Sequence, residues 1–475
     1  MDTKKLRQKI LDLAIRGKLV PQDPNDEPAS VLLERIKAEK EQLIKDGKIK
    51  RSKKSASSDT SPYENVPFEI PENWAWCKPS DVFIINHRNN AEDTIEVGFV
   101  PMPLIKDGYH YQHSYESVLW KTVKTGYTHF TNGDFGLAKI TPCFENRKSV
   151  IFNNLPNGIG AGTTELHILR PIMIDVKYVS YFYSSEEFIS YGIKNFSGAV
   201  GQQRISKEVI EDFGFALPPQ KEQNRIIEAV EKWFSIIDQL EQEQTDLKNA
   251  IKRAKSKILD LAIHGKLVPQ DPNDEPAIEL LRRINPSFKS CDNAHYKSAL
   301  QGWCSISLND CMVEILNGFA FQSGKYVENG IRVIRITNVQ DGKIMDDDPK
   351  FYPKSSIKEI EKFILKKNDL LMSLTGNVGR VGFLPNELLP AALNQRVGCI
   401  RMNEQFIHKK YLFYYFQTDT FRNDCITSAK GVAQLNISTE WLKRYLINIP
   451  PYAEQKRIVA KIEELFATID KIKES

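Results

Sequence analysis

The chain has 475 residues, 41% of them hydrophobic, and its 65 lysines and arginines against 61 acidic residues leave a net charge of +4. This length allows about three or four domains. The weak positive charge permits nucleic-acid binding through local patches but does not predict it. No apolar run approaches the roughly 18 residues of a membrane helix. None of the seven cysteines forms a Cys-x-x-Cys pair, so we expect a reduced, cytoplasmic protein without a metal site.

Two blocks of sequence each occur twice. The first block occupies residues 9–29 and 257–277, at an offset of 248, and the second occupies 217–240 and 449–472, at an offset of 232. Within the first block only Arg16 and His264 differ. The stretches between the blocks read differently, so the sequence predicts a duplicated frame that carries two unlike inserts.

A long helix is predicted over residues 219–264. Pro218 and Pro219 suit its first turn, and Gly265 suits its end. Apolar residues then recur at steps of three and four, which is typical of a coiled coil about 70 Å long. The expected seam is Ile226, Val230, Trp233, Ile237, Leu240, Leu247, Ile251, Ile258 and Leu261. The chain ends repeat this helix in two pieces, with a C-terminal seam of Ile458, Ile462, Leu465 and Ile469.

The two inserts mix short apolar runs with glycines, which indicates short strands in α+β domains. The order along the chain is an N-terminal helix region with a basic linker (1–61), a first insert domain (62–217), a central long-helix region (218–290), a second insert domain (291–449) and a C-terminal helix (450–475). The whole is expected to be a pseudo-two-fold circular repeat: two globular domains separated by two long antiparallel helices.

We find no catalytic constellation, because Walker, dinucleotide-binding and metal-ligand spacings are missing from the sequence. Binding chemistry remains, since arginine and lysine pair with guanine or phosphate while asparagine and glutamine suit adenine. The candidate DNA-binding residues are Arg147, Lys148, Arg204, Arg335, Asn338, Asn377, Arg380, Asn394, Gln395, Arg396, Lys430 and Gln434. A structural or solvated role is the alternative for each. The basic linker at 45–54 has the same two interpretations.

Several motifs resemble the specificity subunits of type I restriction–modification systems. They include the Pro-Pro-x-x-Glu-Gln-x-Arg-Ile helix starts at 218–226 and 450–458, the duplicated block that begins ILDLAI, and the insert signatures at 70–76, 133–151, 158–171, 368–384 and 393–401. The resemblance covers the whole chain.

The resemblance implies two target-recognition domains, each of which reads one half of a split double-stranded DNA sequence, with the helices as a ruler between them. It implies no catalysis and no cofactor in this chain. S-adenosylmethionine, ATP and Mg²⁺ would belong to partners, namely two adenine-methylating modification subunits and two translocase–nuclease restriction subunits. The alternatives are the detached recognition part of a single-chain restriction–methylation enzyme and a coiled-coil adaptor that binds no DNA.

Overall fold

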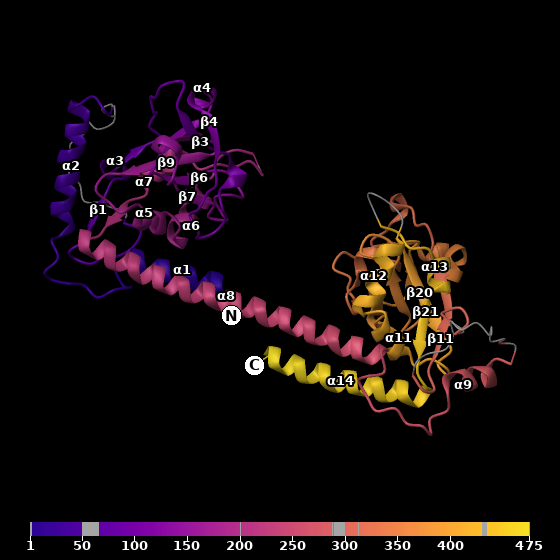
Figure 1. The fold of residues 1–475 in the computed structure, drawn as a ribbon. Coiled ribbons are helices and arrows are strands. Elements are labelled where there is room, and N and C mark those ends of the chain that lie inside the picture. The colour runs from indigo at the N-terminus through magenta and orange to yellow at the C-terminus, as the bar shows by residue number, and fades with distance from the viewer. Residues whose placement is uncertain are drawn as a thin grey trace. The chain divides into compact units, whose positions relative to one another are not determined.

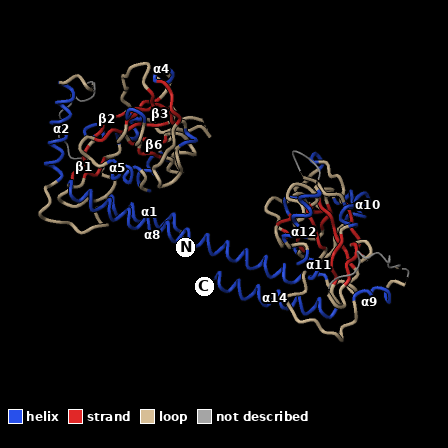
Figure 2. Tube along the Cα trace, viewed as in Figure 1, coloured by secondary structure: helices blue, strands red, loops and turns tan. Residues whose placement is uncertain are grey.

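The computed structural model describes residues 2–49, 66–199, 201–286, 288, 300–311, 313–429 and 435–474. The chain divides into two compact units, Met1–Gln244 and Thr245–Ser475, which are described separately. In each unit the strands gather in one globular domain, while the long helices lie outside it (Figures 1 and 2). Among the described residues, no helix has the length and apolar character needed to cross a bilayer.

The first unit contains a recognition domain, two helices before it and the start of the central helix α8. Its elements are α1 (Thr3–Ile15), α2 (Ala29–Lys45), β1 (Ala75–Cys77), α3 (Pro79–Val82), β2 (Phe83–Ile85), β3 (Glu96–Val100), β4 (Glu116–Leu119), α4 (Trp120–Val123), β5 (Thr128–Thr131), β6 (Phe135–Ala138), β7 (Ser149–Ile151), β8 (Ile159–Gly162), β9 (Leu166–Pro171), α5 (Val176–Tyr183), α6 (Glu186–Lys194), α7 (Lys207–Asp212), β10 (Phe215–Leu217) and α8 (Gln220–Ile263).

The second unit begins within α8 and repeats the plan. Its further elements are α9 (Ala277–Ile284), β11 (Cys304–Ser307), β12 (Val313–Asn317), β13 (Ile331–Ile334), β14 (Val339–Gln340), β15 (Lys343–Ile344), β16 (Phe351–Tyr352), α10 (Ile357–Ile360), β17 (Leu370–Ser373), β18 (Val381–Phe383), β19 (Ala391–Leu393), β20 (Val397–Met402), α11 (Lys409–Tyr415), α12 (Asp419–Ser428), α13 (Thr439–Arg444), β21 (Leu446–Ile449) and α14 (Tyr452–Glu474).

The two recognition domains share a sheet plan although their sequences differ. One sheet has the order β2-β9-β6-β7 in the first domain and β12-β20-β17-β18 in the second. A second sheet places β3 parallel to β8 with β4 outside, and β13 parallel to β19 with β16 outside. The first and last strands of each domain pair with each other, β1 with β10 and β11 with β21. The α+β prediction is confirmed, and the domains are two versions of one topology.

In the first unit, α1 lies antiparallel to α8 (Figure 1). Arg7 pairs with Asp238 at 2.7 Å and with Glu241 at 3.0 Å, and its guanidinium lies 5.0 Å from the ring centre of Phe234. Further along α1 and the loop after it, Gln22 reaches back to Glu222 near the start of α8. Residues later in the N-terminal segment therefore contact residues earlier in α8, as an antiparallel arrangement requires.

In the second unit, α14 packs beside the last turns of α8 with the same chemistry. Lys255 pairs with Asp470 at 2.6 Å and lies 4.9 Å from the ring centre of Phe466. These three residues stand at the positions that Arg7, Asp238 and Phe234 hold in the repeats. The duplicated blocks thus encode the same contact between helices twice.

The predicted seam is correct in part. Ile226, Val230, Ile237, Ile458 and Ile462 are fully buried. Six seam residues are only half-buried: Leu240, Ile251, Ile258, Leu261, Leu465 and Ile469.

Two seam assignments are wrong, because Trp233 is 48% exposed and Leu247 is 43% exposed. Phe234 is buried in place of Trp233, since α8 packs on the recognition domain as well as on α1, which widens its apolar face beyond a two-stranded seam. Leu247 lies between the part of α8 that Arg7 of α1 reaches and the part that α14 covers.

A buried polar knot joins each long-helix start to its recognition domain. In the first unit, Glu222 accepts a hydrogen bond from the indole of Trp74 at 3.0 Å, and Arg225 pairs with the buried Asp26 at 2.6 Å. The side chain of Gln223 donates to the carbonyl of Pro218 and accepts from a backbone N–H at the start of α5. The Glu-Gln-x-Arg signature therefore ties the helix, the acidic turn and the domain together.

The second unit repeats this knot. Glu454 accepts from the Trp303 indole at 3.0 Å, Arg457 pairs with Asp274 at 2.6 Å, and Gln455 donates to the carbonyl of Pro450. The sequence shows Glu222 only as part of the repeated motif at the helix start. Its burial and its bond to Trp74 became visible only in the fold.

Candidate nucleic-acid interface

Loops from distant parts of the second recognition domain meet beside its four-stranded sheet. The backbone of Gly376 donates to the carbonyl of Leu435 at 2.8 Å, and Thr375 forms a bridge with Asn436. Leu374 donates to the carbonyl of Arg396 at 3.0 Å. We define the second loop cluster as residues 318–319, 374–380, 394–396 and 435–436.

Five predicted DNA-binding residues lie in the second loop cluster. Asn377, Gln395 and Arg396 are exposed. Arg380 donates to the side chain of Gln340 at 3.1 Å, and Asn394 accepts from the backbone N–H of Arg396 at 3.1 Å. The cluster therefore presents two amides and the guanidinium of Arg396, which has no ion-pair partner among the described residues; such groups read guanine and adenine edges.

An equivalent set of loops meets in the first recognition domain. Ile140 forms a bridge with Arg204, as Thr375 does with Asn436. The N–H of Lys139 donates to the carbonyl of Glu165 at 3.0 Å, which brings in the turn before β9. We define the first loop cluster as residues 139–148, 163–165, 197–199 and 201–204. The shared sheet order places the two clusters at corresponding positions in their domains.

Arg204 lies in the first loop cluster but is already engaged. Its guanidinium donates two hydrogen bonds to the carboxylate of Glu165, at 2.9 and 3.0 Å. This partner holds the pKa of Glu165 below its usual value. The pair is partly exposed, so a phosphate that approaches Arg204 would have to compete with Glu165 for the guanidinium.

Two of the predicted DNA contacts are structural residues. Arg147 is 4% exposed, donates to the carbonyl of Ser184 at 3.0 Å and pairs with Glu186. Asn338 is 3% exposed and caps a turn by accepting from the backbone of Arg335 at 2.7 Å. The structure does not support DNA contact by either side chain, because burial in these networks removes them from the surface.

The remaining candidates stay predictions. Lys148 pairs with Asp107 at 3.2 Å, and Arg335 pairs with Asp348 at 3.2 Å, each with its side chain partly covered. Lys430 and Gln434 lie outside the described residues, as does the second half of the basic linker, residues 50–54.

Residues 86–90 were missed by the sequence interpretation. The segment reads Asn-His-Arg-Asn-Asn and follows β2, just as 318–319 of the second loop cluster follows β12. Arg88 is exposed and donates to the carbonyl of Tyr127 at 3.2 Å, and Asn89 donates to the carbonyl of Phe130 at 2.8 Å. Burial, together with the Arg88 guanidinium, lowers the pKa of His129 beneath it. The sequence signal that could have identified this segment is its run of five consecutive side chains that can donate hydrogen bonds.

An ion pair with a buried aspartate braces one sheet in each domain, β2-β9-β6-β7 in the first and β12-β20-β17-β18 in the second. Arg170 of β9 donates twice to Asp134, at 2.7 and 2.9 Å, and Arg401 of β20 donates twice to Asp369, at 2.9 and 2.7 Å. Both aspartates are buried and precede β6 and β17, the strands that lead into the two loop clusters. Each pair thus fixes the strand from which the reading loops emerge.

This architecture is shared with known proteins. The family model of the type I restriction modification DNA specificity domain matches residues 71–253 and 301–475. The type I restriction enzyme EcoAI specificity subunit of Escherichia coli is 37% identical over 99% of this chain and 90% of its own length. The EcoEI specificity subunit, also from Escherichia coli, is 34% identical with the same coverage.

The chain belongs to the family of type I restriction–modification specificity subunits. A solved structure described as showing complex assembly and conformational transition of the type I R-M system has a TM-score of 0.60 at 16% identity, with 86% of this chain and 94% of that chain covered, so the fold is shared. The family match decides against an adaptor that binds no DNA, and specificity subunits are non-catalytic.

Proposed function

We propose that each recognition domain of this specificity subunit reads one half of a bipartite, asymmetric DNA target with its loop cluster. The observation that carries this proposal is the pair of clusters at equivalent positions on one duplicated frame, with unlike side chains. The second cluster offers Asn377, Gln395 and Arg396. The first places Arg204 beside Glu165, with Arg88 on the neighbouring loop. Unlike donors on a symmetric frame read unlike half-sites.

The long helices set the distance between the half-sites and dock the other subunits. A stiff helical spacer fixes half-site separation as dimer geometry does in other DNA-binding proteins. We propose two modification subunits and two restriction subunits per complex, one of each for each copy of the frame. A target adenine must leave the base stack before it is methylated, so each recognition domain leaves access for a partner enzyme above its half-site.

The catalytic chemistry belongs to the partners. No cofactor is needed by this chain, while S-adenosylmethionine serves the modification subunits, and ATP with Mg²⁺ serves the restriction subunits. The assembled complex would be an adenine-N6 DNA methyltransferase and an ATP-dependent endonuclease in the cytoplasm, where its DNA lies.

A map of methylated adenines across the host genome, with and without this gene, tests the proposal. Deletion should abolish methylation at one split motif whose two halves differ in sequence. Purified chain with duplex DNA and S-adenosylmethionine should incorporate no methyl groups until the modification subunit is added. An unchanged methylation map, or methyl transfer by the chain alone, would contradict the proposal.

A further inference from the structure

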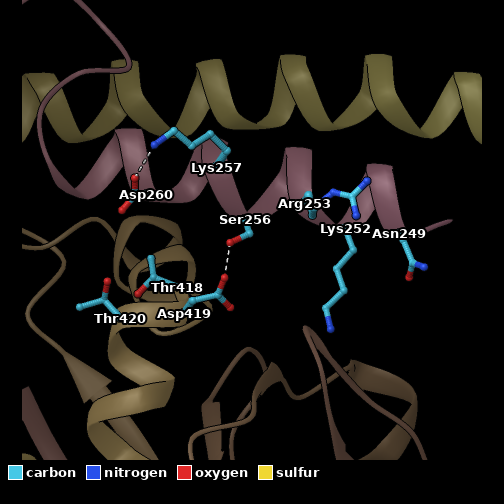
Figure 3. Close-up of a pocket in the computed structure, with 9 residues that line it drawn as sticks. All are labelled: Asn249, Lys252, Arg253, Ser256, Lys257, Asp260, Thr418, Asp419 and Thr420. Carbon is cyan, nitrogen blue, oxygen red and sulfur yellow. Dashed lines mark hydrogen bonds and ion pairs between the residues drawn. The ribbon is translucent and has the colours of Figure 1, made fainter. Parts of the chain in front are cut away.

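A cleft of about 480 Å³ lies in the second unit between α8 and the start of α12 (Figure 3). Asn249 and Lys252 extend from α8 toward the recognition domain, and Thr418, Asp419 and Thr420 form the opposite wall. The hydroxyl of Ser256 donates to Asp419 across its floor. Every residue that lines the cleft belongs to the second unit.

The lining is basic. Lys252, Arg253 and Lys257 line it together with two acidic residues, Asp260 and Asp419. Lys257 pairs with Asp260 at 3.0 Å on its own helix, so these two charges largely cancel. Lys252 and Arg253 are exposed, and no ion-pair partner for either lies among the residues that the structure describes. The lining therefore carries two cations without an ion-pair partner among the described residues, and one aspartate that accepts a hydrogen bond from Ser256.

The corresponding junction in the first unit lies between α1 and the start of α6, and several side chains bridge it. Gln8 stands at the position of Ser256 and donates to Glu186 at 2.8 Å, and Arg147 also pairs with Glu186. Arg16 pairs with Glu187 at 2.7 Å, where the second unit has His264 and Thr420. Shorter side chains in the second unit, Ser and Asp in place of Gln and Glu, leave the junction open. The Gln8–Glu186 contact is kept as Ser256–Asp419, but among the described residues Asp419 and Thr420 form no ion pairs like those of Glu186 and Glu187.

The cleft lies at one end of α12, and the reading loops lie at the other. The ten residues of α12 span about 15 Å. α12 ends at Ser428, and Leu435, a few residues further along the chain, belongs to the second loop cluster. A duplex advances about 3.4 Å per base pair. A duplex whose axis follows α12 would draw level with the cleft about four or five base pairs beyond the bases that the cluster reads.

The geometry points to a phosphate-binding site: the cleft of the second unit holds the DNA backbone next to, but outside, the second half-site. This inference rests on the proposed function. It predicts an asymmetric complex, in which sequence-independent contacts are stronger on the side of the second recognition domain. Lys252 and Arg253 supply the charge, since lysine and arginine neutralise phosphates whatever the base sequence.

The test compares Lys252→Ala/Arg253→Ala with Lys4→Ala/Lys5→Ala, the same two positions of the other copy. Each is assembled with the modification subunit, and affinity for a target duplex and a non-target duplex is measured over a series of salt concentrations. Loss of two phosphate contacts should reduce the slope of log affinity against log salt by about 0.9 per contact, equally for both duplexes. The control pair should leave the slope near that of the wild type.

Two further arms separate the possible results. Lys252→Arg/Arg253→Lys keeps the charge and should keep the slope. Neutral methylphosphonate linkages placed beyond the second half-site should weaken the wild type and have no effect on the alanine pair. An unchanged slope, or a defect limited to association with the modification subunit, overturns the inference and assigns the cleft to a protein partner. Failure of the wild-type complex to prefer any target would instead overturn the proposed function, and the inference with it.

Discussion

The knots at the two long-helix starts are copies, but a glutamine donates to the buried glutamate in the first unit only. In the first unit the Gln22 amide donates to Glu222 at 2.6 Å, so both carboxylate oxygens have partners. In the second unit the equivalent Gln270 amide nitrogen and one oxygen of Glu454 are buried and have no hydrogen-bond partner among the described residues. The indole bond and the arginine–aspartate pair are kept in both copies. The indole–glutamate bond and the arginine–aspartate pair are thus common to both copies of the frame, whereas the bond from the loop glutamine differs between them.

This difference predicts opposite effects of one substitution. Burial raises the pKa of Glu454 to about 7 and also raises the pKa of Glu222, where bonds from Trp74 and Gln22 oppose the shift. A carboxyl whose folded pKa lies above its ordinary 4.5 binds protons more tightly in the folded state. The contribution of Glu454 to the stability of the second unit therefore falls as pH rises from about 4.5 to 7.

Glu454→Gln should remove that pH dependence. At pH 8 it should stabilise the second unit by up to about 2–3 kcal/mol, with little gain near pH 5. Glu222→Gln should instead cost about 1–2 kcal/mol, because its new amide meets the Gln22 donor. Thermal unfolding of both variants at pH 5 and 8 measures this. A loss of stability by Glu454→Gln at pH 8 would show that its second oxygen has a partner.

The glycines that end the repeated block predict a smaller contrast. Gly17 and Gly265 both have positive φ, +65° and +63°. A Cβ at Gly17 would lie 2.4 Å from the rigid ring of Pro71, whereas one at Gly265 would meet the movable end of Leu300 at 2.5 Å. Both alanine variants should be destabilised by about 1 kcal/mol or more, and Gly17→Ala more than Gly265→Ala. Equal unfolding midpoints of the two variants would indicate that the loop at Pro71 moves away from the new methyl group as easily as the Leu300 side chain does.

The smallest effect is expected at the one position where the blocks differ. Arg16 pairs with Asp12 and Glu187 and lies 4.5 Å from the ring centre of Phe68. Arg16→His should cost about 0.5–1 kcal/mol, because the pairs are partly exposed. His264→Arg should be neutral within about 0.5 kcal/mol, since Thr420 offers no carboxylate. Chemical denaturation resolves the two, and a matching loss in both would show that the junctions are equivalent.

The frame could be predicted from the sequence because it is written there twice. Helix starts, helix ends and their order follow from proline, glycine and apolar spacing, and α8 at Gln220–Ile263 lies one residue inside each predicted bound. The burial of Phe234 in place of Trp233 could not be predicted, because it depends on a domain that packs on α8 from outside the helix pair.

The reading surface was only partly predictable for a related reason. A sequence shows which side chains carry donors but not which donors are already used. Arg147 and Asn338 read as DNA contacts and proved to be buried braces, whereas Arg88 went unnoticed although it is exposed. Asn377, Gln395 and Arg396 come together through backbone bonds between loops that no periodic pattern encodes.

The central claim is that one frame, used twice, carries two independent readers. Replacing residues 66–217 with the corresponding insert of a relative, such as the EcoAI specificity subunit, tests it most directly. Mapping of methylated adenines should then show a new first half-site, with the second half-site and the spacing unchanged. A change in both halves, or an altered spacing in an active complex, would contradict the account.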